Sequence, residues 1–297
     1  MPQQRMLVLG GTGLIGRIVV EQALATGIPV RVLTRNATRV AELFGGRAEA
    51  VEGDAADATV VRGAVQGCSG VHLSLDGGQD PDLERRAADA VVAAARDLGV
   101  QRITMLSGAS VCDQNAWFPG TRAKLAAEAA VTSSEIPATV FRSSFFMESL
   151  PRFVKGNRAS VIGRQPTPWH WVAGKDLAGL VMSAHLHGPG AQLVTLLGPE
   201  AMTMTEALQR YCASVNPSAK VGQLPFWAAG LIARMPGGES LAATLPLLKY
   251  ASHVTEVEQA PVIRGATTLD QWLAISGGAT GLEHSPAQVS SNRASRS

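Results

Sequence analysis

The chain has 297 residues and a formal net charge of +2, and 46% of its residues are hydrophobic. A chain of this size buries about 75% of the surface that its unfolded form exposes, so its core needs no disulfide or metal for support. The near-neutral charge argues against a strong electrostatic grip on nucleic acid or an acidic membrane.

Short β-branched or aliphatic segments alternate with helical patterns through the first half of the chain. Strands are predicted at residues 5–9, 29–34, 48–52, 70–75, 101–106 and 138–141. Helices are predicted between them, at residues 14–25, 38–44, 57–65, 82–98 and 121–132. This alternation predicts βαβ units with right-handed crossovers, and hence an α/β protein with a doubly wound parallel sheet of the Rossmann type.

The regular alternation ends near residue 151, and the following segment is rich in Pro, Gly and Trp. Helices are predicted there at residues 175–184, 203–214, 226–234, 241–250 and 268–274. We interpret residues 1–155 as a nucleotide-binding domain and residues 156–275 as a small α+β substrate subdomain. Residues 276–297 contain no aromatic residue and many Ser and Gly, which is typical of a disordered tail.

Cysteine usage and the N-terminal segment indicate the cell compartment. Three cysteines lie far apart in the sequence, which predicts neither a disulfide framework nor a metal cluster. No signal peptide precedes the first predicted strand. The longest segment without charged residues, 177–199, contains His, Gly and Pro and is not a membrane span. We therefore expect a cytoplasmic protein without a metal.

The strongest motif is VLGGTGLIGR at residues 8–17, which follows a predicted strand and opens a predicted helix. This context is that of a dinucleotide-binding turn. Its glycines let backbone amides approach a diphosphate, which the positive end of the helix dipole attracts. The alternative is a tight turn that binds nothing. The residues expected to bind the dinucleotide here are Gly10, Thr12, Gly13, Leu14, Ile15, Gly16 and Arg17.

The tip of the second predicted strand indicates which dinucleotide is bound. An Asp or Glu about 20 residues after the motif normally binds the ribose 2′-hydroxyl of NAD, but the VLTRN segment here carries Arg35 and no acid. Arg35, helped by Arg17 and Arg39, would instead bind a 2′-phosphate, which predicts NADP(H). Solvated surface arginines are the alternative. Asp54 is a candidate partner of the adenine amino group, whereas Asp57 fits a helix cap.

These motifs resemble those of the NmrA-like branch of the atypical short-chain dehydrogenases/reductases. Weaker matches follow in the same order, at residues 94–102, 107, 124–128, 141–148, 174–178, 197–200 and 268–273. The resemblance implies a Rossmann domain that binds NADP(H) and a small C-terminal subdomain that closes over the nicotinamide. The family includes quinone reductases, azoreductase-like proteins and phenylpropanoid reductases, as well as NADP-sensing regulators without turnover, so membership alone does not decide function.

The resemblance also implies further cofactor contacts. In relatives the matching lysine bonds the nicotinamide ribose, and we assign that role to Lys124; an ordinary surface pair with Glu128 is the alternative. Leu75, Ser144 and Phe145 complete the expected cofactor contacts, although relatives commonly have Pro-Gly at positions 143 and 144.

One departure from the short-chain dehydrogenases concerns proton transfer. Their Tyr-x-x-x-Lys motif would require a tyrosine where this chain has Gly120, and its two tyrosines, Tyr211 and Tyr250, lie in the C-terminal half. Without that tyrosine an unactivated ketone is a poor substrate, whereas a quinone or conjugated carbonyl yields a stabilised anion that water can protonate.

The catalytic candidates that remain are Lys124, Ser107 and His170. Ser107, at the end of the fifth predicted strand, could polarise a substrate oxygen or close a loop. His170 lies between two tryptophans and could transfer a proton near neutral pH or be structural. The residues expected to line the substrate are Trp117, Phe146 and Trp169.

The sequence therefore predicts an NADPH-dependent oxidoreductase that transfers hydride to a quinone-like or conjugated carbonyl small molecule. A non-catalytic NADP(H) sensor and a tailoring reductase of specialised biosynthesis are the alternatives. The expected partner is a small molecule, with no nucleic acid and no membrane, and a homodimer is left open.

Overall fold

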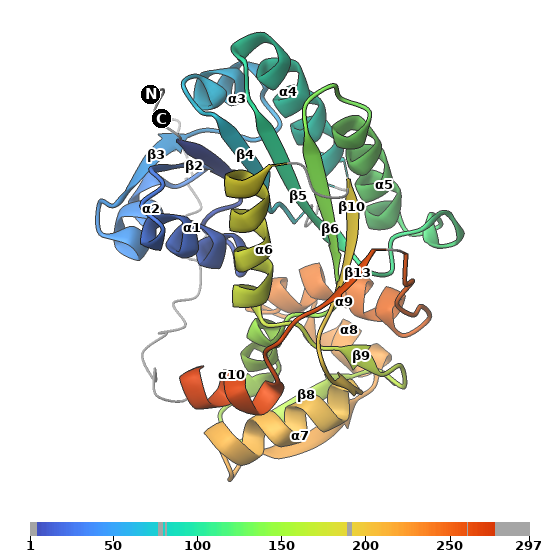
Figure 1. Cartoon of the computed structure of the whole chain (residues 1–297). Helices are drawn as coiled ribbons and strands as arrows, with labels where there is room; N and C mark the ends of the chain where they lie inside the picture. The colour runs from blue at the N-terminus through green and yellow to red at the C-terminus, as the bar shows by residue number, and fades with distance from the viewer. Residues whose placement is uncertain (1–4, 77–79, 81, 189–191, 260, 277–297) are drawn as a thin grey trace, which may run out of the picture.

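An eight-stranded parallel sheet forms the centre of the structure, a computed structural model that describes residues 5–76, 80, 82–188, 192–259 and 261–276 (Figure 1). Its strand order is β13-β10-β6-β5-β4-β1-β2-β3. The order reverses beside β1, because the chain runs from β1 to β3 on one side and returns to β4 on the other. These strands are β1 (Met6–Leu9), β2 (Val30–Thr34), β3 (Ala48–Glu52), β4 (Gly70–Leu73), β5 (Arg102–Gly108), β6 (Ala138–Ser143), β10 (Leu193–Leu197) and β13 (Val262–Arg264). The predicted doubly wound sheet is confirmed.

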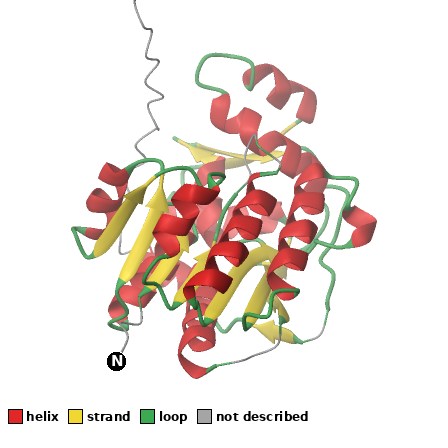
Figure 2. Ribbon diagram, turned by 90° about the horizontal axis from the view of Figure 1, so that it is seen from above, coloured by secondary structure: helices red, strands yellow, loops and turns green. Residues whose placement is uncertain are grey.

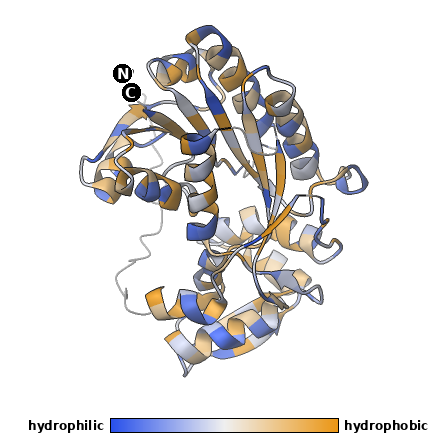
Figure 3. Ribbon diagram, in the orientation of Figure 1, coloured by the Kyte–Doolittle hydropathy of each residue, from blue (hydrophilic) through white to orange (hydrophobic). Residues whose placement is uncertain are grey.

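Helices cover both faces of this sheet (Figure 2). Each face has its own apolar core, built from aliphatic strand residues and the inward sides of the helices. The helices carry both hydrophilic and hydrophobic residues (Figure 3), as expected for helices with one solvent-facing side. One face is covered by α1 (Gly16–Ala25), α2 (Ala37–Phe44) and α6 (Gly174–His187), and the other by α3 (Ala58–Val65), α4 (Leu83–Leu98) and α5 (Pro119–Thr132).

Local sequence signals set the ends of several of these helices. Asp57 caps α3 by accepting two backbone amides of its first turn, as predicted. α2 and α4 end at Gly45 and Gly99, whose φ angles of 57° and 71° lie in the left-handed region that glycine adopts without strain. The predicted elements of the first half accordingly match the observed ones to within two residues at each end.

A smaller region packs beyond the carboxyl ends of the strands, in the lower half of Figure 1. It contains a three-stranded sheet in the order β12-β8-β7 and a two-stranded sheet of β11 and β9. Its core surrounds Trp171, which is fully buried and donates its indole N–H to the carbonyl of Met202. The elements are β7 (Val154–Lys155), β8 (Arg158–Ile162), β9 (Trp169–His170), β11 (Ala201–Met202), β12 (Lys220–Leu224), α7 (Met204–Val215), α8 (Phe226–Ile232), α9 (Glu239–Ala251) and α10 (Leu269–Ser276).

The large sheet draws on both predicted parts of the chain. α6, β10 and β13 follow residue 155 in sequence, yet they belong to the sheet and its helical layer. The chain therefore leaves the Rossmann domain after β6 and re-enters it twice, and the remaining elements make up the α+β region. The predicted tail lies outside the described residues beyond position 276.

Candidate functional site

The glycine-rich turn between β1 and α1 depends on close backbone contacts. Gly10 has a φ of 78°, and a Cβ atom there would lie 2.2 Å from the carbonyl oxygen of Ser74. A Cβ on Gly16 would lie 2.2 Å from the carbonyl oxygen of Gly10. Gly13 differs, because it is exposed and its Cβ would meet only the Gly10 carbonyl oxygen, at 3.1 Å. Gly10 and Gly16 therefore shape the turn, and Gly13 leaves its outer side open.

Unpaired backbone amides gather at the first turn of α1. The amides of Leu14, Ile15 and Gly16 have no hydrogen-bond acceptor within the described residues. Ile15 occupies the N-cap position without a side-chain cap, and the first turn contains no acidic residue. These amides and the positive end of the helix dipole form an anion site. The turn thus fits the diphosphate of a dinucleotide.

Arg35 extends the cationic surface at the tip of β2. Its side chain is exposed and makes no hydrogen bond or ion pair in the part of the chain that the structure describes. Arg39 is instead paired with Glu42, at 3.0 Å. Burial lowers the pKa of Arg17 the most, the negative charge of Glu148 opposes this effect, and the positive charges of Arg152 and Arg39 lower the pKa further. Arg35 is free to bind an anion.

Asp54 lies on the exposed side of the turn after β3. Its Oδ1 accepts the amide of Ala56 at 2.9 Å, which stabilises the turn before α3. Its Oδ2 accepts no hydrogen bond within the described residues. Contact with an adenine stays a prediction for this carboxylate.

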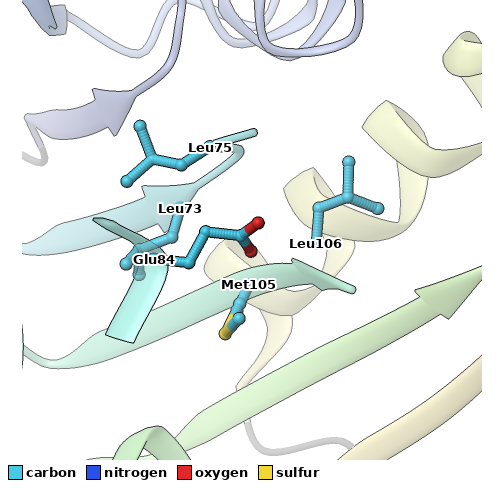
Figure 4. Close-up of a pocket in the computed structure, with 5 residues that line it drawn as sticks. All are labelled: Leu73, Leu75, Glu84, Met105 and Leu106. Atoms are coloured by element: carbon cyan, nitrogen blue, oxygen red, sulfur yellow. The ribbon is translucent and has the colours of Figure 1, made fainter. Parts of the chain in front are cut away.

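Lys124 of α5 forms an ion pair with Glu84 of α4. The Nζ–Oε2 distance is 2.6 Å, and the two side chains are 25% and 8% exposed. Figure 4 shows the Glu84 carboxylate near Leu75 and Leu106, in a small pocket lined by residues of β4 and β5. Lys124 therefore pairs with Glu84 and not with Glu128, which was the alternative partner expected from the sequence. Its ribose contact stays a prediction.

Ser107, Glu128 and Arg142 form a buried cluster between β5, α5 and β6. Ser107 donates its hydroxyl to Glu128 Oε1 at 2.5 Å. Arg142 donates to both carboxylate oxygens, with Nη2 2.5 Å from Oε2. A substrate oxygen could accept from Ser107 only after its bond to Glu128 breaks. The contacts therefore favour the structural role for Ser107.

Glu256 joins two of the predicted site residues. Its Oε2 lies 2.6 Å from Nδ1 of His170, and its Oε1 accepts the His170 amide at 2.7 Å. The hydroxyl of Ser144 also donates to Oε1. Glu256 was not among the predicted site residues, because no motif marks a single Glu in a loop 112 residues after Ser144.

Aromatic residues from both halves of the chain form a wall beside these groups. Phe118 stacks on Tyr250 with ring centroids 4.5 Å apart, and Phe145 meets Trp169 edge to face at 4.9 Å. Trp117 contacts Tyr250 and is 57% exposed. Two residues predicted to line the substrate, Trp117 and Trp169, thus belong to one wall.

Phe146 belongs to a different cluster from these rings. Its side chain packs against the apolar core on the α1 and α6 face of the sheet. Its backbone forms an isolated bridge with Val172. The structure does not bring Phe146 together with Trp117, and its contact with a substrate stays a prediction.

Comparison with known proteins identifies the family. The sequence profile of the NAD(P)H-binding family matches residues 10–179, more than half of the chain, and this range includes the turn, Arg35 and Lys124. The chain belongs to this NAD(P)H-binding family. It is an NmrA-like, atypical short-chain dehydrogenase/reductase, as its motifs indicate.

Relatives of this reductase are known from sequence and from structure. It is 32% identical over 238 residues to the (4-alkanoyl-5-oxo-2,5-dihydrofuran-3-yl)methyl phosphate reductase of Streptomyces griseus, which covers 78% of this chain and 82% of that protein. The triphenylmethane reductase of Citrobacter sp., solved with NADP(H), has a TM-score of 0.70 at 19% identity over 92% of this chain and 99% of its own. The NADPH-dependent quinone oxidoreductase of Escherichia coli, solved with NADPH, has a TM-score of 0.65 at 19% identity over 91% and 99%. The protein is an NAD(P)H-dependent reductase.

Tyr250 of this reductase lies closer to α5 than its position in the sequence indicates. Its phenol oxygen accepts a hydrogen bond from Thr121 at 3.0 Å and lies 3.1 Å from the carbonyl of Ser110, to which it donates. Thr121 directly follows Gly120, where the usual tyrosine of the short-chain dehydrogenases would stand. Tyr250 is only 5% exposed. A phenol thus lies near the expected place, but it is buried and bonded.

The described residues of the reductase contain neither a candidate metal site nor a candidate membrane-spanning helix. Among them, no group of three or more His, Cys, Asp or Glu side chains is arranged to hold a metal ion. No helix in this part of the chain is long and apolar enough to cross a membrane.

Proposed function

We propose that this reductase uses NADP(H) to reduce a quinone-like or conjugated carbonyl compound. One observation carries the proposal. The unpaired amides of Leu14, Ile15 and Gly16 lie at the end of β1, and the exposed, unpaired Arg35 follows its neighbour β2. The amides suit a diphosphate, and a guanidinium on the adjacent strand suits the 2′-phosphate of the same cofactor.

The cofactor would extend along the carboxyl ends of the strands from β2 to β6. The order of the sheet reverses at β1 and β4, and ligands of open α/β sheets bind in the crevice at such a switch point. Glu84 holds the Lys124 ammonium beside β4 and β5, from where it can donate to ribose hydroxyls. The bound cofactor supplies the hydride. The other residues that we assign to the cofactor are Gly10, Thr12, Gly13, Arg17, Asp54, Leu75, Ser144 and Phe145.

The acid–base groups and the relatives support this substrate class. Hydride transfer to a conjugated acceptor leaves a delocalised anion, which tolerates the absence of Tyr-x-x-x-Lys. The names of the three relatives specify an alkanoyl-substituted oxo-dihydrofuran, a triphenylmethane compound and quinones. The acyl-substituted oxo-dihydrofuran and the quinones are conjugated carbonyl systems, and the triphenylmethane compound carries three aromatic rings. The ring of Trp117, 57% exposed, offers an apolar surface to such a molecule, whereas Trp169 is buried within the same wall at 4% exposure.

A substrate panel tests this function. The absorbance of NADPH is followed in the presence of quinones, unsaturated acyl lactones and unactivated ketones. We expect oxidation of NADPH with members of the first two groups and none above background with the ketones. Binding of NADPH without turnover of any acceptor, together with different affinities for the oxidised and reduced cofactor, would support the sensor instead.

Arg35→Ala is expected to weaken NADPH binding by about 10- to 100-fold. The substitution removes a charge-assisted hydrogen bond to the 2′-phosphate, which contributes roughly 1.5–3 kcal/mol. NADH lacks this phosphate, so its dissociation constant should stay the same. Arg62→Ala is the matched control, because Arg62 pairs with Asp97 between α3 and α4, away from the turn. Equal losses for both coenzymes would contradict the role of Arg35.

A further inference from the structure

A hydrogen-bond network that no sequence motif indicates joins Ser144, Glu256 and His170. The carboxylate of Glu256 accepts from the Ser144 hydroxyl and the His170 amide through Oε1, and contacts His170 Nδ1 through Oε2 at 2.6 Å. Its side chain is 9% exposed and that of His170 is 23% exposed. The carboxylate therefore has three partners, and the imidazole still reaches solvent.

This hydrogen-bond network lies at the carboxyl ends of the sheet strands, where the nicotinamide half of the cofactor is expected. Ser144 directly follows β6. The loop that carries Glu256 contacts the end of β5, the neighbour of β6, because the amide of Val257 donates to the carbonyl of Ala109, just after β5, at 2.8 Å. His170 is thus two hydrogen bonds away from the end of β6.

Glu256 determines which nitrogen of His170 is available. Since the carboxylate occupies Nδ1, that nitrogen carries the proton of the hydrogen bond. Nε2 has no hydrogen-bond partner within the described residues. A second proton on Nε2 gives an imidazolium whose charge the adjacent carboxylate stabilises, the arrangement that orients a histidine in acid–base catalysis.

The other candidate proton donors near these strand ends already form hydrogen bonds or ion pairs within the protein. Ser107 donates to Glu128. Tyr250 is buried and donates to the Ser110 carbonyl. Lys124 is paired with Glu84. His170 alone among these presents an available nitrogen at a partly exposed position.

We propose that His170 is the general acid of the reduction and that Glu256 is its positioning residue. The inference rests on the proposed function. Hydride from the cofactor, with its electron pair, forms a C–H or O–H bond on the substrate and leaves negative charge on a conjugated oxygen. The Nε2–H bond of His170 then breaks as an O–H bond forms on that oxygen. The cofactor is oxidised by two electrons, the substrate is reduced by two, and neutral His170 recovers its proton from solvent.

His170→Asn tests the proton transfer. An Asn side-chain amide can still donate to Glu256 in place of Nδ1, but it has no counterpart of Nε2. We expect kcat to fall on the order of 100-fold, with the dissociation constant of NADPH changed by less than about twofold. The pH profile of the wild type should fall on the alkaline side, and that limb should be absent from the variant. His187→Asn, at an exposed position near the end of α6, is the control.

Glu256→Gln tests the positioning without turnover. The amide oxygen must accept from Ser144 and the His170 backbone, so the amide N–H₂ faces Nδ1 and moves the imidazole proton to Nε2. Nitrogen-15 spectra of the cofactor-free protein at alkaline pH should show the Nδ1–H tautomer of His170 in the wild type and the Nε2–H tautomer in the variant. The kcat of the variant should fall at least tenfold.

Each outcome separates this inference from the proposed function. A wild type that binds NADPH and reduces no acceptor contradicts the function, and the inference fails with it. Turnover of His170→Asn within about threefold of the wild type, or an unchanged alkaline limb, contradicts the inference alone. An Nε2–H tautomer in the wild type contradicts the positioning by Glu256. If Tyr250→Phe loses the alkaline limb of the pH profile and His170→Asn keeps it, the proton donor is Tyr250 and not His170.

Discussion

Gly13→Ala is expected to weaken NADPH binding on the order of 100-fold while the fold stays intact. Gly13 is exposed, its φ is not positive, and the new methyl group would meet only the Gly10 carbonyl oxygen at 3.1 Å. The methyl group would instead occupy the approach of the diphosphate to the unpaired amides of α1. Losing one or two hydrogen bonds to a charged group costs about 1.5–3 kcal/mol each. Every 1.4 kcal/mol corresponds to about tenfold in affinity.

Two other glycine variants make this result interpretable. Gly63→Ala on α3 is the matched control, because a Cβ atom there meets nothing within 4 Å. It should bind NADPH as the wild type does. Gly10→Ala should fail by unfolding, since the φ is 78° and the Cβ would lie 2.2 Å from the Ser74 carbonyl oxygen. A folded Gly13→Ala protein with unchanged affinity would mean that the diphosphate does not bind at this turn.

Acidification is expected to destabilise the protein through two histidines, His72 on the interior strand β4 and His185 on α6. His72 is fully buried, and burial, with a smaller effect of His185, lowers its pKa to about 3. Burial and the positive charge of Arg102 lower the pKa of His185 to about 4. His185 keeps a partly exposed edge, but its Nε2 faces the Thr104 hydroxyl at 3.0 Å. His72 Nδ1 contacts the same hydroxyl at 2.9 Å.

The direction of this stability change follows from the number of protons that the folded and the unfolded protein bind. Below the ordinary histidine pKa of about 6.5 the unfolded chain binds protons at both positions, while the folded protein stays neutral there down to about pH 4. Stability is therefore lost as the pH falls through this window. Between pH 7 and pH 5 each histidine should remove about 2 kcal/mol from the free energy of unfolding.

Urea unfolding at pH 7 and pH 5 measures this effect. His72→Asn and His185→Asn should each reduce the pH-dependent loss by about 2 kcal/mol, because each removes one titrating group. His253→Asn, at an exposed position, should leave the loss unchanged. An identical loss in wild type and both buried variants would show that these histidines do not carry the pH dependence.

The first half of the fold could be predicted because its signals are local. Strand segments such as β1 and β4 are buried along their whole length and, apart from His72, carry no polar side chain, as expected for central strands of a parallel sheet. Asp57 and Gly99 mark helix ends within their own turns. The strands β8, β10, β12 and β13 were not predicted. β10 pairs with β6 and β8 pairs with β12, so their partners lie about 50 to 60 residues away in the sequence.

The same distinction applies to the site. The residues of the glycine turn and Arg35 follow from spacing along one βαβ unit, and the family they indicate is confirmed. Glu84, Glu256 and Tyr250 were not predicted as site residues. Each joins the site from 40 residues or more away, through Lys124, Ser144 and Thr121 respectively. Spacing carries no information about such pairs, because the fold brings them together.

Isothermal titration of the purified wild-type protein with NADPH and with NADH tests the central claim most directly. The amides at the head of α1 and the unpaired Arg35 predict a single NADPH site per chain, with affinity at least about tenfold higher than for NADH. Equal affinities for the two coenzymes would contradict selection of the 2′-phosphate by Arg35. No detectable heat with either coenzyme at millimolar concentration would contradict dinucleotide binding at this turn.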